Sequence, residues 1–169
     1  LYNVELNQTI QHTPLLKSNL QKAIRRGNLE IALKTSKTLI KTNFNEFLRR
    51  LFIIVLEDTT AHHCLNELVW MCASYPRWKP SKDQINWLIG VVEVITLNPY
   101  WDIPCFDQTR FDLRKNSEEL AKLDIFDMSM IYSMVLRASY GGMICDVNMI
   151  HYYANLWFNR LVGKNADTH

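Results

Sequence analysis

The sequence predicts an all-α protein of about eight helices, arranged in antiparallel pairs as a bundle or a short solenoid-like stack. Only five Gly and five Pro occur in 169 residues, so few positions would break a helix. Apolar residues recur at helical spacing. Capping residues and Gly or Pro stops separate most of these segments by short turns, which favours antiparallel neighbours.

The first two predicted helices are joined by a short turn and could form a hairpin. A helix from Ser18 through Ile24 ends at Gly27, which suits the left-handed residue after a helix. Asn28 then caps a second helix that reaches about residue 41. One face of this helix is apolar and the opposite face is charged, so it is expected to lie at the surface.

A third helix is expected to begin at Asn43 or Asn45 and to contain the apolar run 51–56. By periodicity alone this run is equally compatible with a buried strand. The helix is preferred because the apolar pattern extends beyond the length of a strand and no turn residue bounds it. A helix that is apolar on every side must be surrounded by other helices.

Charges flank this third helix in the order opposite to that favoured by the helix dipole. Arg49 and Arg50 lie near its beginning, and Glu57 and Asp58 lie at its end. Ion pairs with neighbouring helices are the first interpretation. The alternative is that the two arginines face a phosphate or a partner subunit.

A fourth helix is expected from about Thr60 to Ser74, before Pro76, and a capping box at Ser81 and Gln84 opens a fifth. The fifth helix has few polar residues, so it is expected to be largely buried.

Asn98 and Pro99 end the fifth helix. Residues 99–116 then form a predicted loop that is too long for an ordinary connection between helices. We expect its aromatic residues either to pack on the domain itself or to contact a protein partner. These residues are Tyr100, Trp101, Phe106 and Phe111.

Three more helices are expected after this loop. A short one begins at Ser117, and Asp127 caps the next, which stops at Tyr140-Gly141-Gly142. Ser129, Ser133 and Arg137 form its polar stripe. Asp146 caps the last helix and Gly163 closes it. Asn148, His151, Asn155 and Asn159 form the polar stripe of this last helix.

We expect residues 1–169 to form a single domain, with an irregular N-terminal arm over residues 1–16. No secretory signal is recognised, and a domain of this size needs no disulfides, so the four cysteines indicate an intracellular setting, cytoplasmic or nuclear. No segment is long and apolar enough to span a membrane.

The formal net charge of +2 gives no argument for a polyanionic partner, but the first sixty residues carry nine basic and five acidic side chains. A basic hairpin could neutralise several phosphates; the alternative is a merely solvated face. The candidate nucleic-acid-binding residues are Lys22, Arg25, Arg26, Lys34, Lys37, Lys41, Arg49 and Arg50.

No arrangement of residues predicts catalysis, a metal or a cofactor. His62, His63, Cys64 and Cys72 lack the spacing of a zinc site. Cys145 and His151 fall on different faces of one helix, so they do not form a nucleophile and base. Nucleotide-binding and hydrolase motifs are also absent from the sequence. We therefore expect no enzyme, no small-molecule substrate and no metal or cofactor.

Residues 18–58 resemble the C-terminal helical region of the clamp-loader-like AAA+ ATPases called MgsA, RarA or Werner-helicase-interacting protein. The resemblance rests on Leu20-Gln21-Lys22-Ala23-Ile24-Arg25, on Ile31-Ala32-Leu33, on Arg49-Arg50-Leu51 and on Glu57-Asp58. It implies a helical collar that supports oligomerisation in DNA maintenance. The ATPase domain is missing, and after Asp58 the sequence departs from the glycine of the family pattern.

These observations lead to a functional hypothesis. The chain is expected to be a non-catalytic interaction or oligomerisation module, acting through a protein partner or self-association and associated with DNA. The alternative is a direct nucleic-acid-binding domain that does not read sequence.

Overall fold

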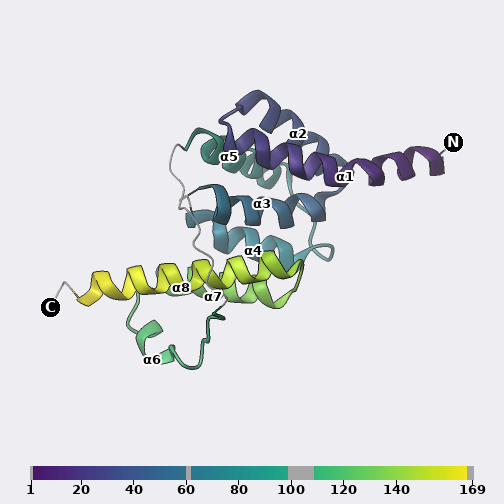
Figure 1. Cartoon of the computed structure of the whole chain (residues 1–169). Coiled ribbons are helices and arrows are strands. Elements are labelled where there is room, and N and C mark those ends of the chain that lie inside the picture. Colours follow the sequence, from purple (N-terminus) through teal and green to yellow (C-terminus); the bar gives the residue numbers. More distant parts are fainter. Residues whose placement is uncertain (1, 60–61, 99–108, 167–169) are drawn as a thin grey trace. The chain divides into compact units, whose positions relative to one another are not determined.

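The computed structural model describes the backbone of residues 2–59, 62–98 and 109–166, and the side chains of residues 12–59, 63–98 and 109–163. Within these ranges the chain forms α-helices and one short 3-10 turn, with no strand (Figure 1). The elements are α1 (Tyr2–Arg25), α2 (Leu29–Thr42), α3 (Phe44–Asp58), η1 (His62–Cys64), α4 (Leu65–Ser74), α5 (Lys82–Leu97), α6 (Ser117–Leu120), α7 (Ile125–Ser139) and α8 (Ile144–Ala166). The predicted all-α class is confirmed.

The chain divides into two compact units. Unit 1 comprises Leu1–Cys64 and Trp70–Asp102, and unit 2 comprises Leu65–Val69 and Ile103–His169. Helix α4 is continuous, so its first half belongs to unit 2 and its second half to unit 1. The expectation of one domain over residues 1–169 stays a prediction.

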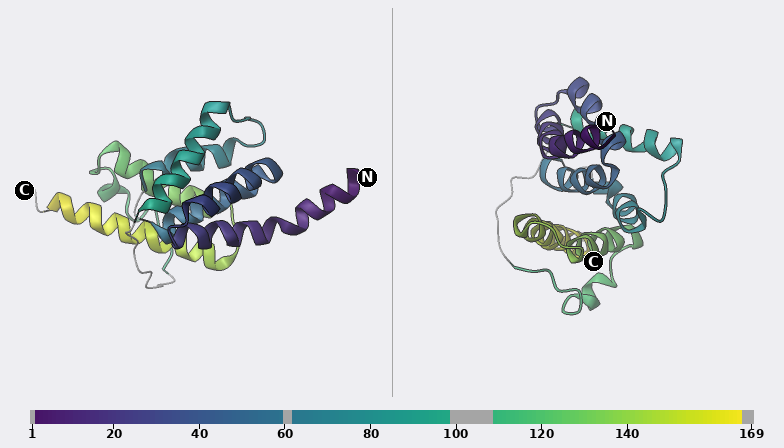
Figure 2. Two further views of the ribbon diagram at one scale, coloured as in Figure 1. Left: turned by 90° about the horizontal axis from the view of Figure 1, so that it is seen from above. Right: turned by 90° about the vertical axis from the view of Figure 1, so that its right-hand side faces the viewer.

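Unit 1 is built around α3. Helix α2 packs against α1, α3 and α5, and α1 also contacts α3 and α5. Figure 2 shows α1 and α2 side by side, with the N-terminal end of α1 extending beyond α2. Every residue from Leu51 to Leu56 is at most 2% exposed. The apolar run is therefore a buried helix rather than a strand, as predicted.

The local signals in unit 1 work as the sequence predicts. Gly27 has a φ of +65°, and the amides of Gly27 and Asn28 donate to the carbonyls of Ile24 and Ala23, which is the Schellman pattern. The Asn28 side chain caps α2 and Asn43 caps α3. Ser81 and Gln84 form both hydrogen bonds of a capping box.

Two expectations for unit 1 are wrong. Residues 1–16 were expected to be an irregular arm, but α1 begins at Tyr2 and passes through Pro14. A proline inside a helix destabilises it by about 3 kcal/mol. The sequence alone therefore favours a helix that begins after Pro14. Helix α5 was expected to be largely buried, but Asn86, Glu93 and Val94 are exposed, so only one of its faces packs inward.

The start of the fourth helix also differs from the expectation. The 3-10 turn η1 occupies His62–Cys64 and α4 begins at Leu65, while residues 60–61 lie outside the described part of the chain. The predicted end at Ser74 is confirmed.

Unit 2 is an antiparallel hairpin of α7 and α8, with the short α6 packed on α8 (Figure 1). Helix α7 ends at Ser139, and Tyr140 and two glycines with positive φ follow, so the predicted stop is confirmed. The predicted cap at Asp127 is wrong. Asp124 caps α7 by accepting from the amides of Phe126 and Asp127, and these bonds lower the pKa of the Asp124 carboxyl.

Both predicted ends of the last helix are also wrong. Helix α8 begins at Ile144, and Asp146 lies within its first turn, where a negative charge still favours the helix dipole. The helix continues through Gly163 to Ala166. Gly163 does not have the positive φ of a C-terminal stop.

Candidate interaction surfaces

The predicted basic residues separate into two groups in the structure. Arg25 and Arg50 are held in a polar network, and Arg49 is half-buried. The others are exposed, and no ion pair joins them to another described residue. These exposed residues are Lys22, Arg26, Lys34, Lys37 and Lys41.

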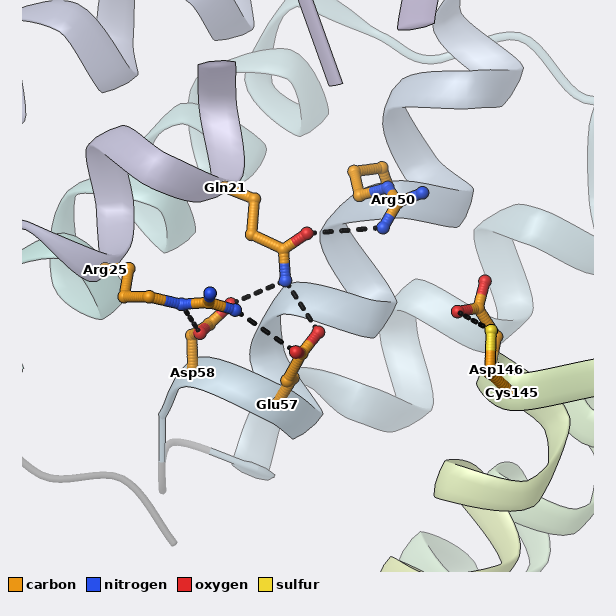
Figure 3. A network of polar contacts seen from close by, with 7 residues as sticks. All are labelled: Gln21, Arg25, Arg50, Glu57, Asp58, Cys145 and Asp146. Carbon is orange, nitrogen blue, oxygen red and sulfur yellow. Dashed lines mark hydrogen bonds and ion pairs between the residues drawn. The ribbon is translucent and has the colours of Figure 1, made fainter. Parts of the chain in front are cut away.

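The network joins the C-terminal ends of α1 and α3 (Figure 3). Arg25 Nε donates to Asp58 Oδ1 at 2.6 Å, and Arg25 Nη2 donates to Glu57 Oε1 at 3.1 Å. Gln21 Nε2 donates to both carboxylates, and Arg50 Nη1 donates to Gln21 Oε1. The bond to Asp58 is the main reason that the pKa of Arg25 is raised.

This geometry confirms that the two acids at the end of α3 form ion pairs with a neighbouring helix. The Asp58 side chain is 5% exposed, so Arg25 and Gln21 supply the hydrogen bonds that water would otherwise make. At the other end of α3, Lys17 pairs with Glu46 and lowers the pKa of that carboxyl. The ends of α3 are thereby attached to α1.

The same network includes most of the charged and amide side chains on which the family resemblance rests. Gln21 and Arg25 come from its first segment, Arg50 from its third, and Glu57 and Asp58 from its last. In the structure these side chains bind one another. Their spacing therefore has a structural explanation, namely the joining of α1 to α3.

The lysines of α2 form an exposed stripe on the side opposite the buried face. Lys34, Lys37 and Lys41 follow helical spacing i, i+3 and i+7. The buried side of the helix carries Ala32, Thr35, Ser36 and Leu39. Like Lys22 and Arg26, these lysines could meet an anion without breaking an ion pair to another described residue.

Of the four loop aromatics, the structure describes only Phe111; Tyr100, Trp101 and Phe106 lie outside the described residues. Phe111 is buried, and its ring meets that of Phe158 edge-on at 5.2 Å between centroids. Its assignment as a partner-contacting residue is therefore corrected, because the side chain belongs to the core of unit 2.

The polar stripe of α8 binds the chain that leads back from the loop. His151 Nδ1 accepts from the Phe111 amide at 3.2 Å, and Asn155 Nδ2 donates to the Thr109 carbonyl at 3.0 Å. Burial, and then the nearby charge of Arg110, lower the pKa of His151. Since a protonated imidazole has no free lone pair, acid would break the bond to Phe111.

The serines of the α7 polar stripe are half-buried and bond to α4. Asn66 Nδ2 donates to Ser129 Oγ, and Ser133 Oγ donates to Asn66 Oδ1, both at 2.7 Å. Arg137 is buried and donates to the Gly141 carbonyl. These polar groups form hydrogen bonds within unit 2.

The exposed face of α7 carries four large apolar side chains around the half-buried Ser129. Ile125, Tyr132, Leu136 and Tyr140 are all exposed, and at 3.6 residues per turn they fall within about 80° of arc. We call these four residues the outer stripe. The buried residues Ile131, Met134 and Ala138 lie on the other side of the helix. Sequence reasoning missed the outer stripe, although its spacing was visible.

The cysteine and histidine candidates do not gather. Among the described residues no three His, Cys, Asp or Glu side chains are placed to hold a metal ion. No disulfide joins Cys64, Cys72 and Cys145 to one another. Cys145 Sγ lies 3.8 Å from Asp146 Oδ1 (Figure 3), and His151 Nδ1 is occupied by the Phe111 amide.

In the described ranges no helix is long and apolar enough to cross a bilayer. Comparison with known proteins found no matching family model, no matching curated protein and no matching solved structure.

Proposed function

We propose that the chain is a non-catalytic helical interaction module of a larger intracellular assembly, and that the outer stripe of α7 makes its protein contact. The observation that carries this proposal is the exposure of four large apolar side chains on the face of α7 opposite its core. Large apolar side chains exposed together on one helix face are typical of interaction sites. The intracellular setting expected from the four cysteines remains part of the proposal.

The resemblance of residues 18–58 to the helical region of clamp-loader-like ATPases supports an oligomeric, DNA-associated role. The resembling side chains also have a structural task, since they join α1 to α3. The predicted contact by Tyr100, Trp101 and Phe106 remains part of the proposal.

Photo-crosslinking in intact cells tests the protein contact. A photoreactive amino acid replaces Tyr132 in the full chain, and the matched control carries it at the exposed Trp87 of α5. We expect protein adducts at position 132 that are absent or much weaker at position 87. Equal labelling at both positions, or none at 132, would overturn the proposal.

A second candidate function is sequence-independent nucleic-acid binding by the lysine stripe of α2. The observation that favours it is that Lys34, Lys37 and Lys41 are exposed on one face, with no ion-pair partner among the described residues. Changing all three to Glu should abolish binding to a DNA duplex in a gel-shift titration. In the wild type, each phosphate contact should contribute about 0.9 to the slope of log affinity against log salt.

The matched control for this test changes three other exposed cations, Arg77, Lys82 and Lys115, to Glu. The change in net charge is the same, so a loss of binding confined to the α2 variant identifies the stripe. Equal affinity in both variants would reject the stripe as the binding site.

A further inference from the structure

The apolar exposure on unit 2 extends beyond the outer stripe. Phe126 at the start of α7, and Met143 and Ile144 at the turn into α8, are also exposed, with values of 57% or more. Together with the outer stripe they form what we call the α7 surface. Its seven residues are Ile125, Phe126, Tyr132, Leu136, Tyr140, Met143 and Ile144.

The size of the α7 surface is that of a stable protein interface. At about 200 Å² for each fully exposed large side chain, the seven exposed fractions correspond to roughly 800 Å². A standard interface takes about 800 Å² from each partner, while the largest apolar patch on a monomer is about 300–600 Å². One copy of this surface therefore provides one full side of an interface.

The outer stripe can pair with itself. Its members follow the spacing i, i+7, i+11 and i+15, and none is charged. If a second α7 runs antiparallel about an axis between positions 132 and 133, Ile125 lies opposite Tyr140 of the second copy. Tyr132 then lies beside its own counterpart, so a single surface serves both sides, as a twofold dimer requires.

The charges at the ends of α7 select the antiparallel direction. Asp124 caps its N-terminal end and Asp127 lies in its first turn, and neither belongs to the outer stripe. A parallel pair would place these carboxylates next to their own copies. An antiparallel pair separates them by roughly 20 Å, the rise of the helix, and also aligns the two helix dipoles favourably.

We infer that a second copy of this chain covers the α7 surface, forming a twofold dimer through an antiparallel pair of α7 helices. This inference rests on the proposed function and names its partner. By contrast, the exposed apolar residues of α5, such as Val94, lie beside the charged Glu93 and the polar Asn86. A self-complementary apolar stripe is thus found on α7 and not on the exposed face of α5.

Sedimentation equilibrium of the full chain tests the dimer. The wild type should sediment as a dimer at micromolar concentration, and Leu136→Glu should raise the dissociation constant at least 100-fold, because the twofold axis introduces the charge twice. The control Leu97→Glu changes another exposed leucine near a helix end and should remain dimeric. Circular dichroism verifies that both variants stay folded.

A wild type that is monomeric at 100 µM, or a dimer that Leu136→Glu leaves intact, would overturn the inference. The crosslinking experiment distinguishes a failure of the dimer from a failure of the proposed function. A crosslink at position 132 to a different protein would preserve the interaction module while rejecting the second copy, and a crosslinked product of twice the chain mass supports both.

The direction of pairing has its own test. Ile125→Glu and Tyr140→Lys each place a charge that suits the nearby helix end, so both variants should fold, but each alone should weaken the dimer at least tenfold. Combined in one chain, they should restore it, because the two new charges meet across the antiparallel interface. A parallel pair predicts further weakening in the combined variant, and that result would overturn the assigned geometry.

Discussion

Helices α3 and α7 have the same length and a similar apolar character, but they use their apolar residues differently. Ten of the 15 residues of α3 are buried, against four of the 15 residues of α7. The ionic ends of α3 are bound to α1, whereas the serines of α7 bond to α4 and the outer stripe of α7 is exposed. The apolar content of a helix therefore predicts that its apolar side chains are buried, but not whether its own chain or a partner buries them.

The largest expected effect comes from placing one charge on each of these helices. Ile54→Asp puts a carboxylate at a fully buried position of α3 and should lower the free energy of unfolding by about 4 kcal/mol or more. Leu136→Asp puts the same group on the outer stripe and should cost the folded monomer under about 1 kcal/mol, apart from the stabilisation lost with the dimer. Urea denaturation followed by circular dichroism measures both values. Equal losses would contradict the distinction between the two helices.

A smaller effect tests the attachment of α3 to α1. Arg25→Gln leaves the Asp58 carboxylate with fewer donors in a site that is 5% exposed, and should cost about 1–2 kcal/mol. This value is discounted because the Arg25 side chain is itself 51% exposed. The neighbouring exposed Arg26 provides the control, since Arg26→Gln should change the unfolding midpoint in urea hardly at all. If the two variants unfold alike, the network contributes no stability.

Two glycines, one in each unit, should respond to alanine in opposite directions. Gly27 has a φ of +65°, so Gly27→Ala should cost about 1 kcal/mol. An added Cβ at Gly27 would only touch the Thr96 carbonyl oxygen at 3.7 Å, so the cost is conformational.

Gly163 lies within α8, and nothing lies within 4 Å of a Cβ added there. Gly163→Ala should therefore stabilise α8 by about 0.5–1 kcal/mol. Thermal melts of the two variants measure both effects. A loss of stability in Gly163→Ala would mean that the chain does not continue as a helix at this position.

The smallest expected effect is the pH dependence that His151 gives to unit 2. Its pKa is lowered by burial and by Arg110, so the unfolded chain takes up this proton more readily than the folded one. The stabilising contribution is complete above the ordinary pKa near 6.5 and is lost as pH falls through the lowered value. Unfolding midpoints at pH 7.5 and pH 5 should differ less in His151→Gln, whose amide oxygen can still accept from Phe111. An unchanged pH dependence would exclude His151 as its source.

Much of unit 1 could be predicted because its signals are local. Asn28, Asn43 and Ser81 bind amides within the next three residues, and Gly27 acts within its own turn. Fewer ends were predicted correctly in unit 2. Asp124 and Asp127 are both compatible with the start of a helix, and Gly163 is a possible stop that the helix passes through.

The candidate surfaces depend on distant contacts, which the sequence alone does not reveal. Arg25 looks like any exposed cation until Asp58, 33 residues later, lies beside it. Ser129 and Ser133 look like a solvated stripe, but Asn66 binds both from more than 60 residues away. The outer stripe was visible as a spacing, yet only the burial of the opposite face shows that it is left uncovered.

The bond between the Phe111 amide and His151 gives unit 2 a local reporter in hydrogen exchange. This amide lies outside any helix, where backbone protons usually exchange with solvent quickly, but the imidazole nitrogen accepts it. At neutral pH it should therefore exchange as slowly as amides within a helix. Once the imidazole takes up a proton, that protection ends while the helical amides of α8 keep theirs, so a single slow amide records the protonation of one half-buried side chain.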